Sequence, residues 1–175
     1  MEPTFRPDRP QTGIPLLLVA LAAIIIVADQ ITKALAVARL DDGESVSVIE
    51  GILHWTLQRN PGAAFGLFQR FPLVFTVLAT AITVGILVMI RKVPDRFHAV
   101  ALGLVLGGAV GNLIDRVARP PGVFRGHVID FIDFRVWPVF NIADSAVVVG
   151  AGLLAIASFR AERRAKQDRG PVSDS

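Results

Sequence analysis

Four long apolar runs dominate the pattern of hydrophobic and polar residues along this chain. The first begins at Ile14 and carries no charge as far as Ala28, after which it continues through a few polar residues. Of the other three, two contain no charged residue and the last contains only Asp144. A helix needs roughly 17–25 mostly apolar residues to cross a bilayer. The pattern therefore predicts four membrane-spanning helices, at about residues 14–36, 71–90, 97–114 and 139–159.

A different period appears between the first two runs. Residues 45–49 and 53–58 alternate polar and apolar side chains, and Glu50 and Gly51 separate the two stretches. Period two bounded by turn residues is typical of paired strands. We expect a small β-hairpin or sheet at the outer boundary of the membrane. A solvent-facing hairpin without a function explains the same pattern.

Composition agrees with a membrane protein of one domain. The chain has 175 residues, of which 53% are hydrophobic and 19% charged, which argues against a disordered chain and an ordinary soluble globule. The absence of cysteine excludes disulfides, zinc ribbons and a thiol nucleophile. The net charge of +3 comes from basic residues between the apolar runs, which argues against a nucleic-acid partner. We expect one membrane-embedded domain over residues 1–175, with a disordered tail from about residue 167 to residue 175.

Lysine and arginine predict the orientation in the membrane. Residues 1–13, 91–96 and 160–175 hold 10 of the 18 basic residues, whereas the longer segments 34–70 and 115–138 hold 7. Basic residues favour the cytoplasmic side. Both termini are therefore expected in the cytoplasm, with about residues 37–70 and 115–138 outside. Residues 36–38 have the small side chains of a signal-peptide cleavage site, but the charged residues before them favour a retained span.

With this topology, the polar residues of the spans converge near the outer ends of the helices. An ionisable residue in a span is costly and suggests a function. Purely structural roles explain some of these residues as well. Asp29 and Lys33 can form an ion pair, Asp115 and Arg116 can pair at the membrane boundary, and Asp144 can stabilise a helix N-terminus. The residues that gather at this level are Asp29, Lys33, Asn60, Asn112, Asp115, Arg116, Asp130, Asn141 and Asp144.

The glycines of the third span suggest close packing. Gly103, Gly107 and Gly111 have the small-xxx-small spacing of helix–helix contacts. Gly108, Asn112 and Arg116 form a neighbouring stripe, which we expect to face a cavity.

Two aspartates are the most economical catalytic set among these groups. Facing carboxyls can share one proton, so that one acts as a base toward water and the other as an acid toward a carbonyl. Asp144 at a helix N-terminus should ionise more easily, and Asp130, on a loop among aromatic residues, should be protonated more easily. Residue chemistry alone leaves Asp115 and Asp133 as competitors for the second position.

Other classes of protein remain as alternatives. A Ser/Lys peptidase would use Ser145 and Lys33. A proton-coupled transporter or a channel would place carboxylates near the middle of the membrane with access to both sides. The inner halves of the second, third and fourth spans carry no charge, which argues against a conducting path. The three histidines lack the spacing of metal ligands, so no metal site is expected.

Five sequence blocks, taken together, resemble the lipoprotein signal peptidases, or signal peptidase II, from end to end of the chain. In order, the blocks are Asp29-Gln30-Ile31-Thr32-Lys33, Asn60-Pro61-Gly62-Ala63-Ala64-Phe65, Gly107-Gly108-Ala109-Val110-Gly111-Asn112-Leu113-Ile114-Asp115-Arg116, Gly126-His127-Val128-Ile129-Asp130-Phe131 and Phe140-Asn141-Ile142-Ala143-Asp144-Ser145. The resemblance implies four transmembrane helices with a small extracytoplasmic β-sheet.

The resemblance also implies an activity. Family members are aspartic endopeptidases of the bacterial plasma membrane, with the site at the extracytoplasmic face. They cut signal peptides from prolipoproteins just before a diacylglyceryl-modified cysteine, without metal or organic cofactor, and globomycin inhibits them. The implied partners are these prolipoproteins and membrane lipids.

The resemblance assigns roles to residues as well. It implies Asp130 and Asp144 as the catalytic pair. It assigns positioning of the substrate to Asn60, Gly62, Asn112, Arg116 and Asn141, and support of that architecture to Asp29, Lys33 and Asp115. Two features depart from the common form of the family: Pro61, and a longer stretch between Arg116 and Asp130 that we expect to affect substrate access more than chemistry.

Overall fold

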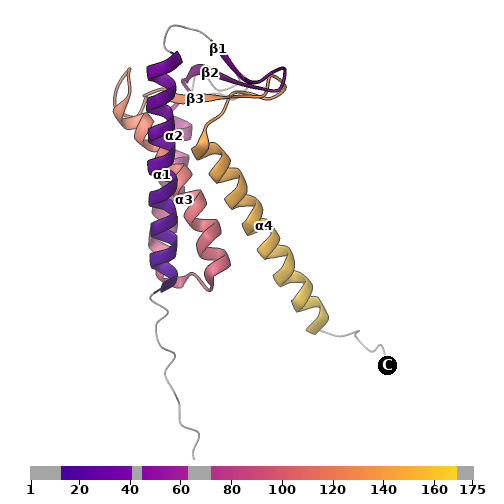
Figure 1. Cartoon of the computed structure of the whole chain (residues 1–175). Helices are drawn as coiled ribbons and strands as arrows, with labels where there is room; N and C mark the ends of the chain where they lie inside the picture. Colours follow the sequence, from indigo (N-terminus) through magenta and orange to yellow (C-terminus); the bar gives the residue numbers. More distant parts are fainter. Residues whose placement is uncertain (1–12, 41–44, 63–71, 169–175) are drawn as a thin grey trace, which may run out of the picture.

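Long helices make up most of the molecule. The computed structural model describes residues 13–40, 45–62 and 72–168. Within these residues, four helices are long and apolar enough to cross a membrane. They are α1 (Gly13–Leu40), α2 (Pro72–Met89), which continues into the 3₁₀ turn η2 (Ile90–Lys92), α3 (Arg96–Ala118) and α4 (Ile142–Asp168). Figure 1 shows α1 and α3 standing side by side, while α4 slants away from α1.

A small antiparallel sheet lies at one end of the bundle, called the sheet end below. Its strands are β1 (Ser45–Ile49), β2 (Leu53–Asn60) and β3 (Val128–Asp133), in the order β1-β2-β3 (Figure 1). The predicted hairpin is confirmed by β1 and β2, with Val46 opposite Trp55 and Ser47 opposite His54. The first and last described residues, Gly13 and Asp168, lie at the opposite end of the bundle.

Strand β3 was not predicted, and the placement of Asp130 on a loop was wrong. Asp130 lies within β3, opposite Gln58 of β2. Five of the six residues of β3 are buried, so the strand has no exposed face. A strand buried on both faces lacks the alternation by which a sequence indicates a strand.

Helix α3 is the centre of the bundle, and the other three helices pack on it. A Cβ at Gly103 or at Gly107 would lie 2.9 Å from a backbone oxygen of α1, so both glycines allow α1 and α3 to approach closely. Gly111 faces Asp29 of α1 and Ala143 of α4. The predicted packing role of these three glycines is confirmed.

Gly108 does not face a cavity, contrary to our expectation. A Cβ at this position would lie against the backbone of Ala143 and the side chain of Val147, both in α4. Asn112 and Arg116, the other members of the predicted stripe, do line a groove. Gly108 differs from these two residues because its missing side chain lets α4 pack directly on α3, which leaves no space for a cavity there.

Helices α3 and α4 begin or end at residues other than those predicted, and polar residues lie at these ends. Helix α3 continues through Asp115 and Arg116 to Ala118, and α4 begins at Ile142 because Asn141 caps it. Helix α4 also includes Gln167 and Asp168, the first residues of the tail predicted to be disordered. The rest of that tail, residues 169–175, and residues 63–65 of the second sequence block lie outside the described residues.

Replacement of Gly108 by alanine tests the close packing of α3 on α4. The added methyl group would lie 2.7 Å from Cγ2 of Val147 and closer still to the carbonyl oxygen of Ala143. We expect a loss of about 1–3 kcal/mol in the free energy of unfolding, the usual cost of overpacking.

Gly85→Ala is the matched control, because nothing lies within 4 Å of a Cβ at that position of α2. Alanine should stabilise this helix by up to about 1 kcal/mol. Thermal unfolding in detergent micelles measures both variants. A Gly108→Ala protein as stable as the parent would contradict the packing described.

Candidate functional site

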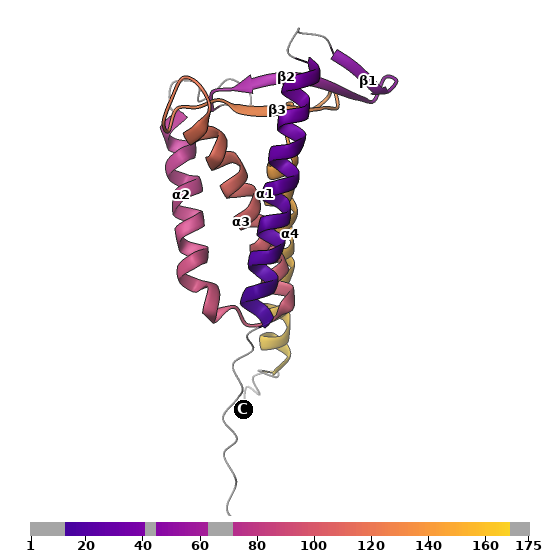
Figure 2. The ribbon, with the colours of Figure 1, turned by 60° about the vertical axis from the view of Figure 1, so that its left-hand side comes forward.

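A groove of about 710 Å³ runs between α2 and α4 at the sheet end of the bundle. Both helices pack on α3, and Figure 2 shows α2 standing apart from α1 and α4. The walls are apolar, with Leu78 and Ile82 from α2 and Val147 and Val148 from α4. The polar residues that line the groove are Gln58, Asn60, Asn112, Arg116, Asp130 and Asp144.

The start of helix α4 places Asp144 in the groove. Asn141 caps the helix: its Oδ1 accepts the Asp144 N–H at 2.8 Å, and Oδ2 of Asp144 accepts the Asn141 N–H at 3.3 Å. This reciprocal pair is a capping box. Oδ1 of Asp144 accepts a hydrogen bond from Nδ2 of Asn112 at 2.7 Å. Both carboxyl oxygens of Asp144 are therefore held in place.

Strand β3 brings Asp130 to the same groove, where two amides hold it. Oδ1 of Asp130 accepts from Nδ2 of Asn141 at 2.7 Å, and Oδ2 accepts from Nδ2 of Asn60 at 2.9 Å. The Gly62 N–H donates to Oδ1 of Asn60 at 2.8 Å and so fixes the orientation of that amide. At Gly62 the backbone φ is 132°, which favours glycine.

The surroundings of Asp130 favour its protonated form. The side chain is buried, with an exposed fraction of 1%. Removal from water is the main cause that raises the pKa of Asp130 to about 7, and the charge of Asp144 adds to it. The hydrogen bonds from Asn60 and Asn141 act in the opposite direction, because they favour the carboxylate.

Three asparagines join the two aspartates into one network. Asn141 donates its side-chain amide to Asp130 and its backbone N–H to Asp144. The side-chain oxygen of Asn112 accepts from Nδ2 of Asn141 at 3.2 Å and from Nζ of Lys33 at 2.9 Å. A shift of either carboxyl would therefore disturb hydrogen bonds of the other.

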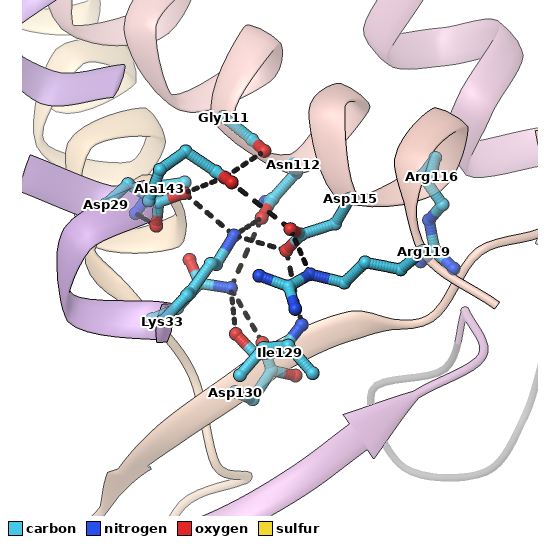
Figure 3. A network of polar contacts seen from close by, with 12 residues as sticks. Asp29, Lys33, Gly111, Asn112, Asp115, Arg116, Arg119, Ile129, Asp130 and Ala143 are labelled. Atoms are coloured by element: carbon cyan, nitrogen blue, oxygen red, sulfur yellow. Dashed lines mark hydrogen bonds and ion pairs between the residues drawn. The ribbon is translucent and has the colours of Figure 1, made fainter. Parts of the chain in front are cut away.

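A buried ion cluster supports this network (Figure 3). Nζ of Lys33 lies 2.8 Å from Oδ2 of Asp29 and 2.8 Å from Oδ2 of Asp115, and all three side chains are fully buried. Oδ1 of Asp29 accepts the Ala143 N–H at 3.0 Å, in the first turn of α4. Oδ2 of Asp115 accepts the Ile129 N–H at 3.3 Å, beside Asp130. The cluster therefore connects α1 and α3 to the two segments that carry Asp130 and Asp144.

Arg116 does not have the partner that the sequence suggested. Instead of pairing with Asp115, Arg116 donates from Nη1 to the backbone oxygens of Asn60 at 3.3 Å and Gly126 at 3.1 Å. Asp115 pairs with Lys33 and with Arg119, whose Nε lies 2.6 Å from Oδ1. Sequence reasoning missed Arg119, although its i,i+4 spacing from Asp115 was a signal.

The residues of the competing mechanisms have other partners. Asp133 accepts from the Thr56 hydroxyl at 3.1 Å and the Arg135 N–H at 2.7 Å, and it does not line the groove. The Ser145 hydroxyl donates to the Asn141 oxygen at 3.0 Å, whereas the Lys33 ammonium contacts Asp29, Asp115 and Asn112. The geometry therefore gives no Ser/Lys pair.

The structure brings all ten predicted site residues together at the sheet end. Asn60, Gly62, Asn112, Arg116, Asp130 and Asp144 line the groove, and Asp29, Lys33, Asp115 and Asn141 belong to the polar network beside it. Among the described residues, no group of three or more His, Cys, Asp or Glu side chains is arranged to hold a metal ion.

Comparisons with known proteins agree on one family. The model of the family described as signal peptidase (SPase) II matches residues 21–160. A lipoprotein signal peptidase of Mycobacterium leprae (strain Br4923) is 48% identical over 142 residues, which cover 81% of this chain and 71% of the relative. A lipoprotein signal peptidase of Mycobacterium avium (strain 104) is 48% identical over 151 residues, which cover 86% and 82%.

Solved structures show the same fold. A bacterial membrane enzyme solved by the in meso method at 2.3 Å is 29% identical, with a TM-score of 0.73 over 98% of this chain and 99% of the other. A second, at 1.9 Å, is 32% identical with a TM-score of 0.70, over 87% and 97%. The family model spans most of the chain, and the resemblance found in five sequence blocks is confirmed: the chain belongs to the signal peptidase II family.

Proposed function

We propose that this chain is a membrane aspartic endopeptidase that removes signal peptides from bacterial prolipoproteins, cutting just before the diacylglyceryl-modified cysteine. Membership of the family supports the substrate class. The observation that carries the mechanism is the pair Asp130 and Asp144, which line one groove and share Asn141 as a hydrogen-bond donor. No other aspartate or glutamate of the described residues lines this groove.

The two carboxyls divide the work of acid and base. Two carboxyls in one poorly solvated site hold a single proton between them more readily than none. The proton resides on Asp130, and the N-terminus of α4 favours the negative charge on Asp144. In this state the pair can deliver one proton and accept another.

Cleavage then follows from these two charge states. Asp144 removes a proton from a water molecule, whose oxygen attacks the scissile carbonyl carbon, while Asp130 gives its proton to the carbonyl oxygen. The resulting tetrahedral diol collapses as Asp144 passes a proton to the cysteine nitrogen and the C–N bond breaks. The diol hydroxyl returns its proton to Asp130. The products are a carboxyl end on the signal peptide and a free amine on the lipid-modified cysteine.

The asparagines act first on the aspartates. The side-chain nitrogens of Asn60, Asn112 and Asn141 all donate to carboxyl oxygens of Asp130 or Asp144. We therefore assign these three residues to the positioning of the carboxyls. The backbone of the substrate binds donors that leave their present acceptors when the peptide enters the groove. Backbone groups in a membrane need such partners, because no water replaces them.

The groove suits a lipid-bearing peptide. Its apolar walls on α2 and α4 offer a surface for acyl chains and for the apolar signal peptide, next to the polar sheet end. We place the sheet end on the outer side of the plasma membrane, with both termini in the cytoplasm, because basic residues are concentrated at the opposite end of the bundle. By family resemblance, globomycin should inhibit the enzyme.

Asparagine substitutions test the assigned pair. Asp130→Asn and Asp144→Asn each remove a group that transfers a proton, so we expect turnover to fall by roughly 10³-fold or more. The measurement is a gel-shift assay of a diacylglyceryl-modified prolipoprotein with purified enzyme in micelles.

Two variants control this test. Asp133→Asn changes an aspartate of the same strand that does not line the groove, and Ser145→Ala removes the hydroxyl that a Ser/Lys peptidase would use. Both should retain most of the activity. Loss of cleavage in Ser145→Ala together with activity in Asp130→Asn would refute the two-aspartate mechanism.

The pH dependence tests which carboxyl carries the proton. Because Asp130 must be protonated to act as the acid, kcat/KM should fall as the pH rises through about 7. The hydrogen bond from Asn60 lowers the pKa of Asp130. Its removal in Asn60→Ala should therefore move the alkaline limb of the profile to higher pH.

The exposed Ser47 of β1 provides the control, since Ser47→Ala should leave the profile unchanged. A profile without an alkaline limb near neutral pH, or a limb that moves to lower pH in Asn60→Ala, would contradict the assignment of the acid.

A further inference from the structure

The ion cluster of Lys33, Asp29 and Asp115 is not neutral without Arg119. Lys33 supplies one positive charge to two buried carboxylates, Asp29 and Asp115, with both distances at 2.8 Å. These three groups carry a net charge of −1. A buried carboxylate without a compensating charge is costly. Nε of Arg119, 2.6 Å from Oδ1 of Asp115, brings the sum of the four groups to zero.

Arg119 is well placed to hold Asp115. It is the C-cap of α3, where its backbone N–H donates to the backbone oxygen of Asp115 at 3.0 Å, while its side chain folds back onto the carboxylate of the same residue. A positive charge at a helix C-terminus is favourable in addition. The segment that follows returns to this turn, because the Gly126 N–H donates to the Arg116 oxygen at 3.0 Å. The side chain of Arg119 remains partly exposed.

Asp115 in turn holds the strand that carries Asp130. Strand β3 pairs with β2 along one edge, and beyond this pairing the backbone of Phe140 bridges it at Ile132. The N–H and oxygen of Ile129 have side chains as partners instead. The Ile129 N–H donates to Oδ2 of Asp115 at 3.3 Å, and the Ile129 oxygen accepts from Nδ2 of Asn141 at 3.3 Å. Two side chains therefore take the place of a neighbouring strand at the residue next to Asp130 (Figure 3 shows the contacts of Asp115, Arg119 and Ile129).

We propose that Arg119, which lies between the sequence blocks of the family, is a positioning residue for peptide-bond cleavage. It supplies the second positive charge on Asp115, and Asp115 then holds the Ile129 N–H and with it the carboxyl of Asp130. The proposal rests on the role of Asp130 in the proposed function. Arg119 touches neither substrate nor reacting atoms, so its effect is on the geometry of the acid and not on binding.

Substitution of Arg119 separates this role from a general loss of stability. In Arg119→Gln, we expect kcat to fall by about 10- to 100-fold with KM unchanged, the scale of a small misplacement of a catalytic group. Arg119→Lys keeps the charge and should restore most of kcat. Arg125→Gln, which removes an exposed arginine of the same segment, should behave as the parent.

Hydrogen–deuterium exchange at the Ile129 amide, followed by NMR on the full chain in micelles, gives a readout that does not depend on activity. Exchange should be faster in Arg119→Gln than in the parent and in Arg119→Lys. A folded Arg119→Gln with parental kcat, or with parental exchange at Ile129, would overturn the proposal. So would an Arg119→Lys variant no better than Arg119→Gln, or an equal loss in Arg125→Gln.

Failure of this inference is distinguishable from failure of the proposed function. If Asp130→Asn still cleaves, the proposed function is wrong, and the exchange rate of Ile129 still decides whether Arg119 positions β3. If only the Arg119 variants behave as the parent, the proposed function stands and the inference falls. Should Arg119→Gln not fold, Arg119→Lys decides: parental exchange and near-parental kcat support the proposal, and a loss of kcat as large as in Asp130→Asn overturns it.

Discussion

One buried ammonium group determines how the polar end of this bundle is assembled. Lys33 is fully buried, and its three contacts, to Asp29, Asp115 and Asn112, match the three protons of an ammonium. In surroundings without water such a charge is tolerated only with partners of opposite charge or with hydrogen-bond acceptors. These partners extend the constraint outward, since Asp29 holds the first turn of α4 and Asp115 holds β3. The positions of Asp130 and Asp144 therefore depend on a charge that neither of them contacts in the hydrogen-bond network.

The same constraint divides the molecule into a part held by the polar network and a part held by apolar packing alone. Helices α1, α3 and α4 and strand β3 are joined by the polar network, whereas α2 contributes only apolar side chains to the groove and packs on α3. The groove consequently has a polar end whose side chains are fixed by hydrogen bonds, and an apolar wall on α2 that makes no directional contacts. This division fits a substrate with one bond to be cut and a long apolar remainder. It also explains why the small residues of α3 matter, because Gly108 and Gly111 bring α4 close enough for Asn112 to reach Asp144.

Much of this arrangement could be predicted from the sequence, and the exceptions have physical causes. Apolar runs predicted the helices, period two predicted the β1–β2 hairpin, and the level of the polar residues predicted that nine of the ten site residues gather at one end. The tenth, Gly62, came from the family resemblance alone. Strand β3 was not predicted because it is buried on both faces. Its aspartates also stand three residues apart, so polar and apolar residues do not alternate. The sequence suggested Arg116 as the partner of Asp115 and missed Arg119. Both neighbours are basic, and only the path of the chain after α3 decides which side chain turns back. The direction in which each asparagine amide points likewise depends on contacts between distant segments.

The central claim is that the proton of the pair resides on Asp130, whose pKa is raised to about 7, beside a charged Asp144. Difference infrared spectroscopy of the purified protein in micelles, followed across neutral pH, observes protonated carboxyls directly. The account predicts a protonated-carboxyl band that disappears with a midpoint of about 7 and is missing in Asp130→Asn, while Asp133→Asn retains it. A band that persists in Asp130→Asn, or no band that titrates near neutral pH, would contradict the account.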